Sequence, residues 1–379
     1  MSGDSGRQAR SESRSADRRS AVDFFASDYS SARAKFLAAA REAGAALSSV
    51  RNPEAGPAGE PLYTDAAWIG SPGAEGVLVT ISSTHGAEGF CGSGVQVGTF
   101  ATGFPRELPA NVALLAIHAI NPFGFAWLRR VNEDNVDLNR NYVDHDGPYP
   151  ANPGYEQLRD AICPADWDDA ARLRCKAVFD AYAAQRGMMA LQSAISSGQY
   201  SHAEGVFYGG RAPVWSRRTL GEILRRHCGN ARHVAVIDLH TGLGPYGYGE
   251  IMNDHDPRDS GYGRINAWFG GEATTFDQGT SSSAVTTGST VTGVTGALPQ
   301  AEVSEITLEY GTRPLEEVFD AVRADNWLHV HGDLASEHGK AIKAQMRATF
   351  YPDTDDWKRM IWERALDVQR RMVKGLAET

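Results

Sequence analysis

A histidine and a glutamate three residues apart, His85 and Glu88, follow the apolar segment 76–82. That segment is rich in β-branched residues and predicts a short buried strand, so both side chains would lie just past the strand's end. An imidazole nitrogen and a carboxylate oxygen at this spacing can converge on one cation, and zinc favours that combination of ligands. A catalytic zinc site requires one further protein ligand and an open coordination position.

His240 is the candidate for the third ligand, because it ends the apolar segment 233–240 and precedes a glycine-rich turn. Any single histidine here could instead be held by an ordinary hydrogen bond, and His-x-x-Glu alone arises often by chance. Three such residues at strand ends nevertheless indicate a metal site. Asp238, two residues earlier, would share a strand face with His240 and could orient a ligand histidine.

A stretch dense in arginine and asparagine, residues 129–141, lies between these segments. An arginine fork binds a carboxylate through two hydrogen bonds, so Arg140 is a candidate for holding a substrate carboxylate, with Asn139 adding a neutral hydrogen bond. Arg130, or Arg129, could polarise a scissile carbonyl and stabilise its oxyanion. The alternative is a solvated loop in which the arginines pair with neighbouring acidic residues.

Glu309 interrupts the apolar strand candidate 306–310. A carboxylate in such a strand is costly to bury unless it has a partner or a catalytic role. Beside a metal-activated water it could act as the general base and then deliver the proton to the leaving amine. Glu305 is its nearest competitor, but it lies near the start of the strand. The alternative for Glu309 is an edge-strand position facing water.

Five motifs in chain order resemble those of the M14 family of zinc carboxypeptidases and of the related succinylglutamate desuccinylase and aspartoacylase group. The resemblance is greatest to a branch called DUF2817 and spans about residues 24–335. The motifs are His85-Gly-Ala-Glu88, Asn121-Pro-Phe-Gly124, Val136-Asp-Leu-Asn-Arg-Asn141, Ile237-Asp-Leu-His240 and Glu309.

This resemblance implies a three-layer α/β/α sandwich around a mostly parallel mixed sheet, one Zn²⁺ per chain, and amide hydrolysis. Carried over by position, the resemblance implies that the metal ligands are His85, Glu88 and His240. It implies that Glu309 is the general base and Arg130 the oxyanion arginine. Asn139 and Arg140 would hold the substrate carboxylate. Arg129 remains a further candidate for substrate binding.

The expected function is a zinc-dependent hydrolase that cleaves a peptide or N-acyl amide bond in a substrate with a free carboxylate. One alternative is an N-acyl amino acid deacylase or esterase, because the His-Gly and His-Thr-Gly motifs resemble the deacylases. Another is a non-catalytic carboxylate-binding protein on the same fold. Ser93 lacks the Gly-x-Ser-x-Gly context of serine hydrolases. Three tyrosines are candidates for capping the substrate: Tyr246, Tyr248 and Tyr310.

The composition fits a globular protein with a sizeable core, since 42% of the 379 residues are hydrophobic and 22% are charged. A formal net charge of −10 argues against a nucleic-acid partner. No apolar run approaches the roughly 18 residues of a membrane span, so no membrane partner is expected. Four scattered cysteines without metal-site spacing favour reduced thiols and a cytoplasmic location.

Along the chain, residues 1–22 are expected to form a disordered tail and residues 23–379 a single catalytic domain. Strands predicted at 76–82, 111–118, 233–240 and 306–310 alternate with helices, which favours a mostly parallel sheet. A helical insertion is predicted around 143–205. Residues 51–62 predict a loop, and residues 279–296 a mobile loop or an edge hairpin.

Overall fold

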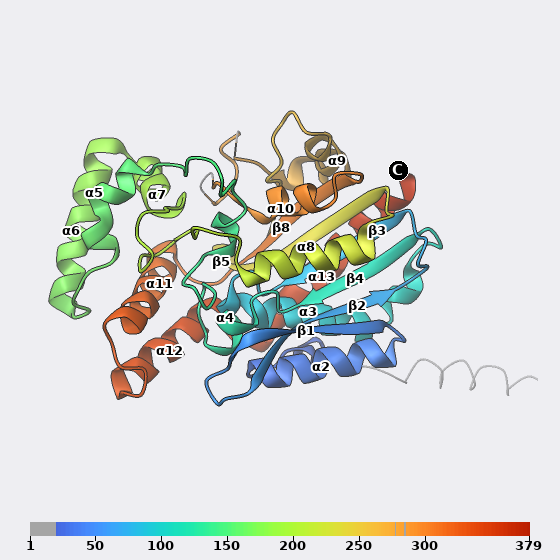
Figure 1. Ribbon diagram of the computed structural model, residues 1–379, viewed down its shortest axis with the longest axis horizontal. Coiled ribbons are helices and arrows are strands. Elements are labelled where there is room, and N and C mark those ends of the chain that lie inside the picture. Colours follow the sequence, from blue (N-terminus) through green and yellow to red (C-terminus); the bar gives the residue numbers. More distant parts are fainter. Residues whose placement is uncertain (1–19, 277, 284–285) are drawn as a thin grey trace, which may run out of the picture.

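The computed structural model describes residues 20–276, 278–283 and 286–379. An eight-stranded mixed sheet carries helices on both faces, and a further group of helices lies beyond one end of it (Figure 1). The strand order is β1-β2-β4-β3-β5-β8-β6-β7. β4, β3, β5 and β8 are mutually parallel, whereas β2 pairs antiparallel with both β1 and β4, and β6 with β8. The predicted fold class is confirmed.

The four central strands are the four that the apolar segments predict: β3 (Gly76–Ser82), β4 (Val112–His118), β5 (His233–Tyr246) and β8 (Glu302–Gly311). Every residue of β3 and β4 is buried. Continuous apolar runs are typical of parallel strands covered on both faces, because neither face has to meet water.

Helices from distant parts of the chain cover the two faces. α2 (Tyr29–Glu42), α3 (Gly89–Ala101) and α13 (Asp355–Glu378) contribute to the apolar cluster on one face, and α8 (Trp215–Cys228) to that on the other. Asp28 caps the start of α2, because its carboxylate accepts a hydrogen bond of 2.7 Å from the Ser31 amide.

The predicted loop at 51–62 is wrong. β1 (Ala46–Ala55) and β2 (Pro61–Ile69) form a hairpin there, and only a tight turn, closed by the Gly56 N–H donating to the Glu60 carbonyl, remains between them. β1 is the edge strand and most of its residues are exposed, so it lacks the apolar signal of a core strand. Pairing with β2 stabilises it instead.

Two further predictions are changed by packing. The segment 279–296, predicted to be a loop or hairpin, includes much of α10 (Thr290–Ala297), whose Val294 is buried beside α8. Of the predicted tail, residues 1–19 lie outside the described residues. Ala21–Phe24 forms a 3-10 helix that buries Phe24 against the first face.

The segment 143–205, for which a helical insertion is predicted, contains three helices: α5 (Pro153–Ile162), α6 (Asp169–Arg186) and α7 (Met188–Ser196). These three helices share a third apolar cluster with α11 (Leu315–Val330) and α12 (Glu337–Phe350), beyond the end of the sheet (Figure 1). The remaining elements are short: α4 (Pro122–Ala126), α9 (Ser260–Phe269), β6 (Gly249–Met252) and β7 (Ala273–Thr274), with four more 3-10 turns, Gly86–Glu88, Phe104–Glu107, Leu138–Arg140 and Gly270–Glu272.

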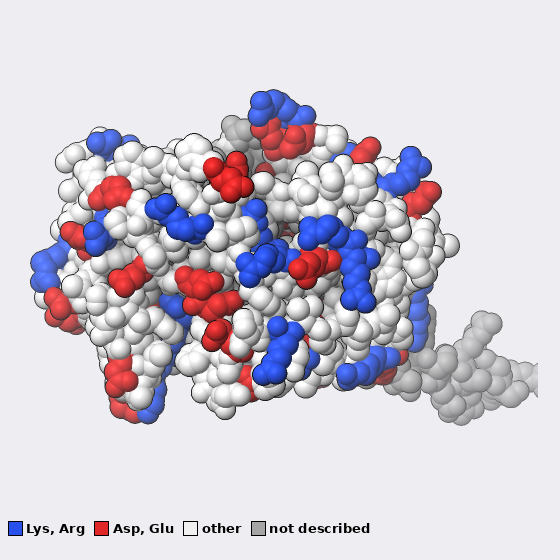
Figure 2. Space-filling model, in the orientation of Figure 1, with Lys and Arg blue, Asp and Glu red and all other residues white. Residues whose placement is uncertain are grey.

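The surface carries both signs of charge. Figure 2 shows acidic and basic side chains interspersed over one face, and neither sign forms a continuous patch there. All four cysteines are free thiols. Within the described part of the chain, none of the helices combines the length and apolar character needed to cross a bilayer.

An ion pair between α2 and β2, in which the carboxylate is buried and the arginine is 24% exposed, should matter to stability. Arg33 holds the fully buried Asp65 with two hydrogen bonds, Nε to Oδ2 at 2.7 Å and Nη2 to Oδ1 at 3.0 Å. Arg33→Ala would leave a buried carboxylate without its cation, and we expect a loss of about 3 kcal/mol in the free energy of unfolding, measured with urea.

The matched control for that prediction is Arg370→Ala. Arg370 also makes two hydrogen bonds to a carboxylate, that of Glu107, but both side chains are about half exposed. Its loss should cost about 1 kcal/mol or less. Equal effects of the two substitutions would contradict the role assigned to burial.

Candidate metal centre

The parallel pairing of three strands gathers the candidate residues at one edge of the sheet. β3 and β5 pair up to Ser82 and Leu239, so the turn carrying His85 lies beside His240. Glu88 ends a 3-10 turn and directly precedes α3. On the other side of β5, Glu309 of β8 is the register partner of His240. The carboxyl ends of parallel strands therefore place all four side chains together.

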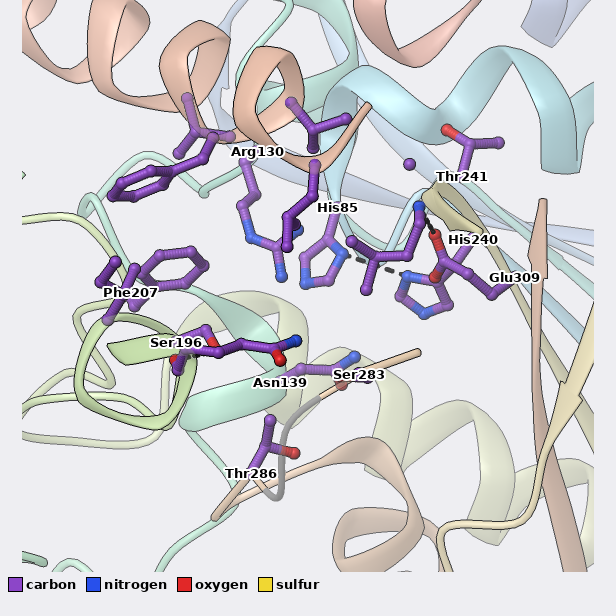
Figure 3. A pocket seen from close by; sticks show the side chains of 18 of the residues that line it. His85, Arg130, Asn139, Ser196, Phe207, His240, Thr241, Ser283, Thr286 and Glu309 are labelled. Carbon is purple, nitrogen blue, oxygen red and sulfur yellow. Dashed lines mark hydrogen bonds between the residues drawn. The ribbon is translucent and has the colours of Figure 1, made fainter. Parts of the chain in front are cut away.

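Three of these side chains converge on one point, as Figure 3 shows for the two histidines. His85 Nδ1 lies 3.0 Å from Glu88 Oε1, His240 Nδ1 lies 3.0 Å from Glu88 Oε2, and the two Nδ1 atoms are 3.1 Å apart. All three side chains are buried. Two ring nitrogens and a carboxylate facing one another form a donor set that a cation satisfies better than any sharing of protons.

The far nitrogen of each ring faces a carboxylate. His85 Nε2 lies 3.1 Å from Asp137 Oδ1, and His240 Nε2 lies 2.9 Å from Asp238 Oδ2, the latter as an ion-pair contact rather than a well-aligned hydrogen bond. Carboxylates at these positions favour a proton on each Nε2. Both Nδ1 lone pairs are then directed to the centre, as in metal sites whose histidines are oriented by acidic partners.

These orienting carboxylates are themselves held in place. Asp238 accepts hydrogen bonds from the hydroxyls of Thr84 (2.7 Å) and Thr290 (3.1 Å). Asp137 accepts one from Arg130 Nε at 3.0 Å. Burial alone would raise the pKa of Asp137, but the Arg130 guanidinium, followed by His85, holds it well below its usual range.

Glu88 is held by both rings and by the backbone, since the Thr241 N–H donates to its Oε2 at 3.0 Å. Burial opposes ionisation of this carboxyl, but the His85 and His240 rings lower its pKa below the usual value. The site therefore offers a carboxylate, which is the form that binds a metal.

Close backbone contacts fix the turn that carries His85. Ser83 adopts the left-handed conformation, with φ of 65°, directly after β3. A Cβ on Gly86 would lie 2.0 Å from the carbonyl carbon of Gly124, so only glycine fits there. This contact explains why the His-Gly and Asn-Pro-Phe-Gly motifs occur together: their glycines pack against each other.

Glu309 lies within the sheet, because β8 is flanked by β5 and β6, so it is not on an edge strand facing water. Its side chain is buried, and Oε1 accepts a hydrogen bond of 2.8 Å from the Leu243 N–H. Burial raises the pKa of Glu309 to about 8, and the Glu88 carboxylate adds to the rise. A bound dication would lower that pKa. Glu305, by contrast, does not line the cavity.

A cavity of about 480 Å³ opens over this centre. Arg130 lines it beside His85 (Figure 3), with Nη1 3.4 Å from Glu88 Oε1. Asn139 and Arg140 line it too. Arg140 Nε donates to the Ser196 carbonyl at 3.1 Å, and the Asn139 side-chain oxygen accepts from the Thr290 N–H at 3.1 Å.

Other predicted residues do not reach the cavity. Arg129 is buried elsewhere, with Nε 3.1 Å from Asp325 Oδ2 and Nη2 2.9 Å from the Asn135 side-chain oxygen. None of the three candidate tyrosines lines the cavity; Tyr310, for example, is fully buried and donates to the Ile361 carbonyl. Ser93 is buried as well, 2.9 Å from His118 Nε2.

Two polar residues of the site are not among those selected from the sequence. Asp137 orients His85, and its only sequence signal is its place in the Val-Asp-Leu-Asn-Arg-Asn motif. Asp254 lines the cavity and accepts a 3.0 Å hydrogen bond from Thr307, and burial raises its pKa to about 6. It follows β6, which has four residues and gives too short a signal to predict.

In a comparison with known families, the family described as "Protein of unknown function (DUF2817)" matches residues 25–364. Comparison with the sequences of curated proteins gives no match.

Several solved structures are similar in part. Bovine thrombin-activatable fibrinolysis inhibitor, in complex with tick carboxypeptidase inhibitor, is 11% identical, with 90% of this chain and 98% of that chain covered and a TM-score of 0.39. A metallo-carboxypeptidase from Burkholderia cenocepacia is 13% identical, with 86% of this chain and 68% of that chain covered and a TM-score of 0.37. Succinylglutamate desuccinylase from Chromobacterium violaceum is 16% identical, with 84% of this chain and 74% of that chain covered and a TM-score of 0.34. At such scores these likenesses carry no weight for activity.

The donor set predicts a specific metal stoichiometry. We expect elemental analysis of the purified protein, after addition of Zn²⁺, to find about one zinc per chain, and none in His240→Ala, because two of the three donors do not form a tight site. Asp238→Asn should retain the three donors but bind zinc about 10- to 100-fold more weakly in a chelator competition, because His240 loses its orienting carboxylate.

Asp169→Asn is the control for Asp238→Asn, since the Asp169 side chain is almost fully exposed on α6. It should bind zinc as the wild type does. A wild-type protein that binds no zinc would refute the metal centre.

Proposed function

Because the chain belongs to the DUF2817 family and carries a convergent His2Glu donor set, we propose that it is a zinc-dependent hydrolase. The bond cleaved is an amide, peptide or N-acyl, in a substrate with a free carboxylate. The observation that carries this proposal is the buried Glu309, which lines the same cavity as the three donors and is the register partner of His240.

The donor chemistry fits zinc. Two imidazole Nδ1 atoms and one carboxylate, from His85, His240 and Glu88, form a ligand set used by catalytic zinc sites that keep one position open. The cavity over the centre leaves room for a substrate and a water. A zinc ion bound here would lower the pKa of a coordinated water to about 7 and polarise the substrate carbonyl.

The protein's own groups would do the rest of the chemistry. Glu309 would accept the proton of the attacking water and then deliver it to the leaving nitrogen, which requires a carboxyl whose pKa lies near the working pH. Arg130, held by Asp137, would face the carbonyl oxygen and stabilise the negative charge that develops on it. A guanidinium fixed in this way needs no reorganisation during the reaction.

Asn139 and Arg140 would hold the free carboxylate of the substrate. Both line the cavity, and Arg140 is anchored by the Ser196 carbonyl while keeping further N–H groups for a ligand. Arg129 would not bind the substrate, because its guanidinium forms an ion pair with Asp325.

Glu309→Gln tests the proposed base. The variant should bind one zinc per chain and lose at least about 100-fold in kcat, because the amide has no basic oxygen to take the proton. The assay is release of free amine from a panel of dipeptides and N-acyl amino acids.

Glu305→Gln is the matched control, on the same strand but outside the cavity. Its turnover should stay within a few-fold of wild type. Undiminished turnover in Glu309→Gln would remove Glu309 from the mechanism, and a wild type that binds zinc but cleaves nothing in the panel would favour a non-catalytic carboxylate-binding protein.

Arg140→Ala tests the carboxylate clamp. We expect kcat/KM for an N-acyl amino acid to fall by about 10- to 100-fold more than kcat/KM for the corresponding carboxamide, since a charged hydrogen bond contributes roughly 1.5–3 kcal/mol. Comparing the two substrates cancels any shift of α7 that follows the loss of the Ser196 contact. Equal losses for both would refute the clamp.

A further inference from the structure

The cavity has two kinds of wall. The polar groups around the three donors come from the strand ends and the loops beside them, whereas three helices beyond the sheet, α6, α7 and α11, contribute a wall of mainly apolar side chains. Six of the side chains in this helical wall are Phe179, Leu191, Ile195, Val318, Phe319 and Val322.

The helical wall is a packed structure. The rings of Phe179 on α6 and Phe319 on α11 meet with centroids 5.7 Å apart. Leu191 on α7 and Val318 on α11 are more than nine-tenths buried and belong to the same apolar cluster. Because the helices support one another, the wall exists before any ligand arrives, which limits the entropy cost of binding.

Apolar side chains continue to the mouth of the cavity. Met188 at the start of α7 and Leu315 at the start of α11 line the cavity, yet they are 66% and 51% exposed. α6 contributes two charged residues there, Lys176 and Asp180, which form an ion pair with Nζ 3.0 Å from Oδ1. α6 therefore adds no unpaired charge to this apolar track, and the remaining charged side chain that the three helices contribute is the exposed Glu316, next to Leu315 on α11.

We propose that this helical wall binds a linear alkyl chain, the acyl part of an N-acyl amino acid whose carboxylate meets Asn139 and Arg140. A compact acyl group would fill the interior and leave Met188 and Leu315 unused, whereas an extended chain covers both. This inference rests on the proposed function and deepens it, by naming an alkanoyl amide as the substrate class.

The test is a binding series that does not depend on turnover. N-acetyl-, N-butanoyl-, N-hexanoyl-, N-octanoyl- and N-decanoylglycine are titrated calorimetrically into the zinc-loaded Glu309→Gln protein, in which hydrolysis is suppressed. Each added methylene should lower Kd by about three- to fourfold, until the chain reaches the rim. A Kd that does not change with chain length would overturn the proposal.

Two variants locate the chain. Leu191→Ser should raise the Kd of N-decanoylglycine by about tenfold or more and that of N-acetylglycine far less, because the substitution removes apolar contact inside the wall. Met188→Ser replaces an exposed side chain and should leave the fold intact. It should raise the Kd of N-decanoylglycine and leave that of N-hexanoylglycine unchanged. Met189→Ser is the matched control, on the same helix, 81% exposed and outside the cavity; it should behave as the parent protein does.

Phenylacetylglycine distinguishes shape from hydrophobicity. If it binds as tightly as decanoylglycine, the wall takes a compact aromatic group and the linear-chain proposal is wrong. The series also separates this inference from the proposed function. If Kd falls steeply with chain length but the wild type hydrolyses nothing, the alkyl-binding wall is supported and the hydrolase is refuted. If the wild type is active but Kd does not change with chain length, the hydrolase is supported and the alkyl-binding wall is refuted.

Discussion

The arrangement of this protein depends on a cluster of charged groups buried at the carboxyl edge of a parallel sheet. His85, Glu88 and His240 face one another in the interior, where unpartnered charge is costly. Every group in the cluster therefore has a second partner behind it. Asp137 and Asp238 face the two rings, and those carboxylates are bonded in turn to other side chains.

These second partners tie together parts of the chain that lie far apart in sequence. The Asp238 carboxylate is held by Thr84 after β3 and by Thr290 at the start of α10. Arg130 connects Asp137 with Glu88. Such links make the site rigid, because moving one loop would leave a buried charge unpaired. A donor set held in this way is preorganised for a cation, and the left-handed Ser83 shows that the turn tolerates strain to achieve it.

The helices beyond the sheet add a different property. The strand ends supply the polar groups around the donors, and α5, α6 and α7 pack with α11 to build the apolar side of the cavity. The two parts of the cavity come from different elements: the three convergent donor side chains lie at the sheet edge, and the apolar side chains lie on helices beyond it. This division allows the same edge to serve substrates of different shape.

The sequence by itself predicts the central strands, the helices around them and the three convergent side chains, because these follow from local patterns. A buried parallel strand needs an unbroken apolar run, and His85, Glu88 and Glu309 stand out where such runs end or are interrupted. It does not predict β1 or β6, whose exposure or shortness removes the pattern, nor the orienting role of Asp137. Arg129 and Arg130 are adjacent and chemically identical, yet only the tertiary structure decides that the first pairs with Asp325 and the second enters the cavity. The reason is physical: a side chain's partner across the fold depends on where distant segments pack, and no local pattern contains that information.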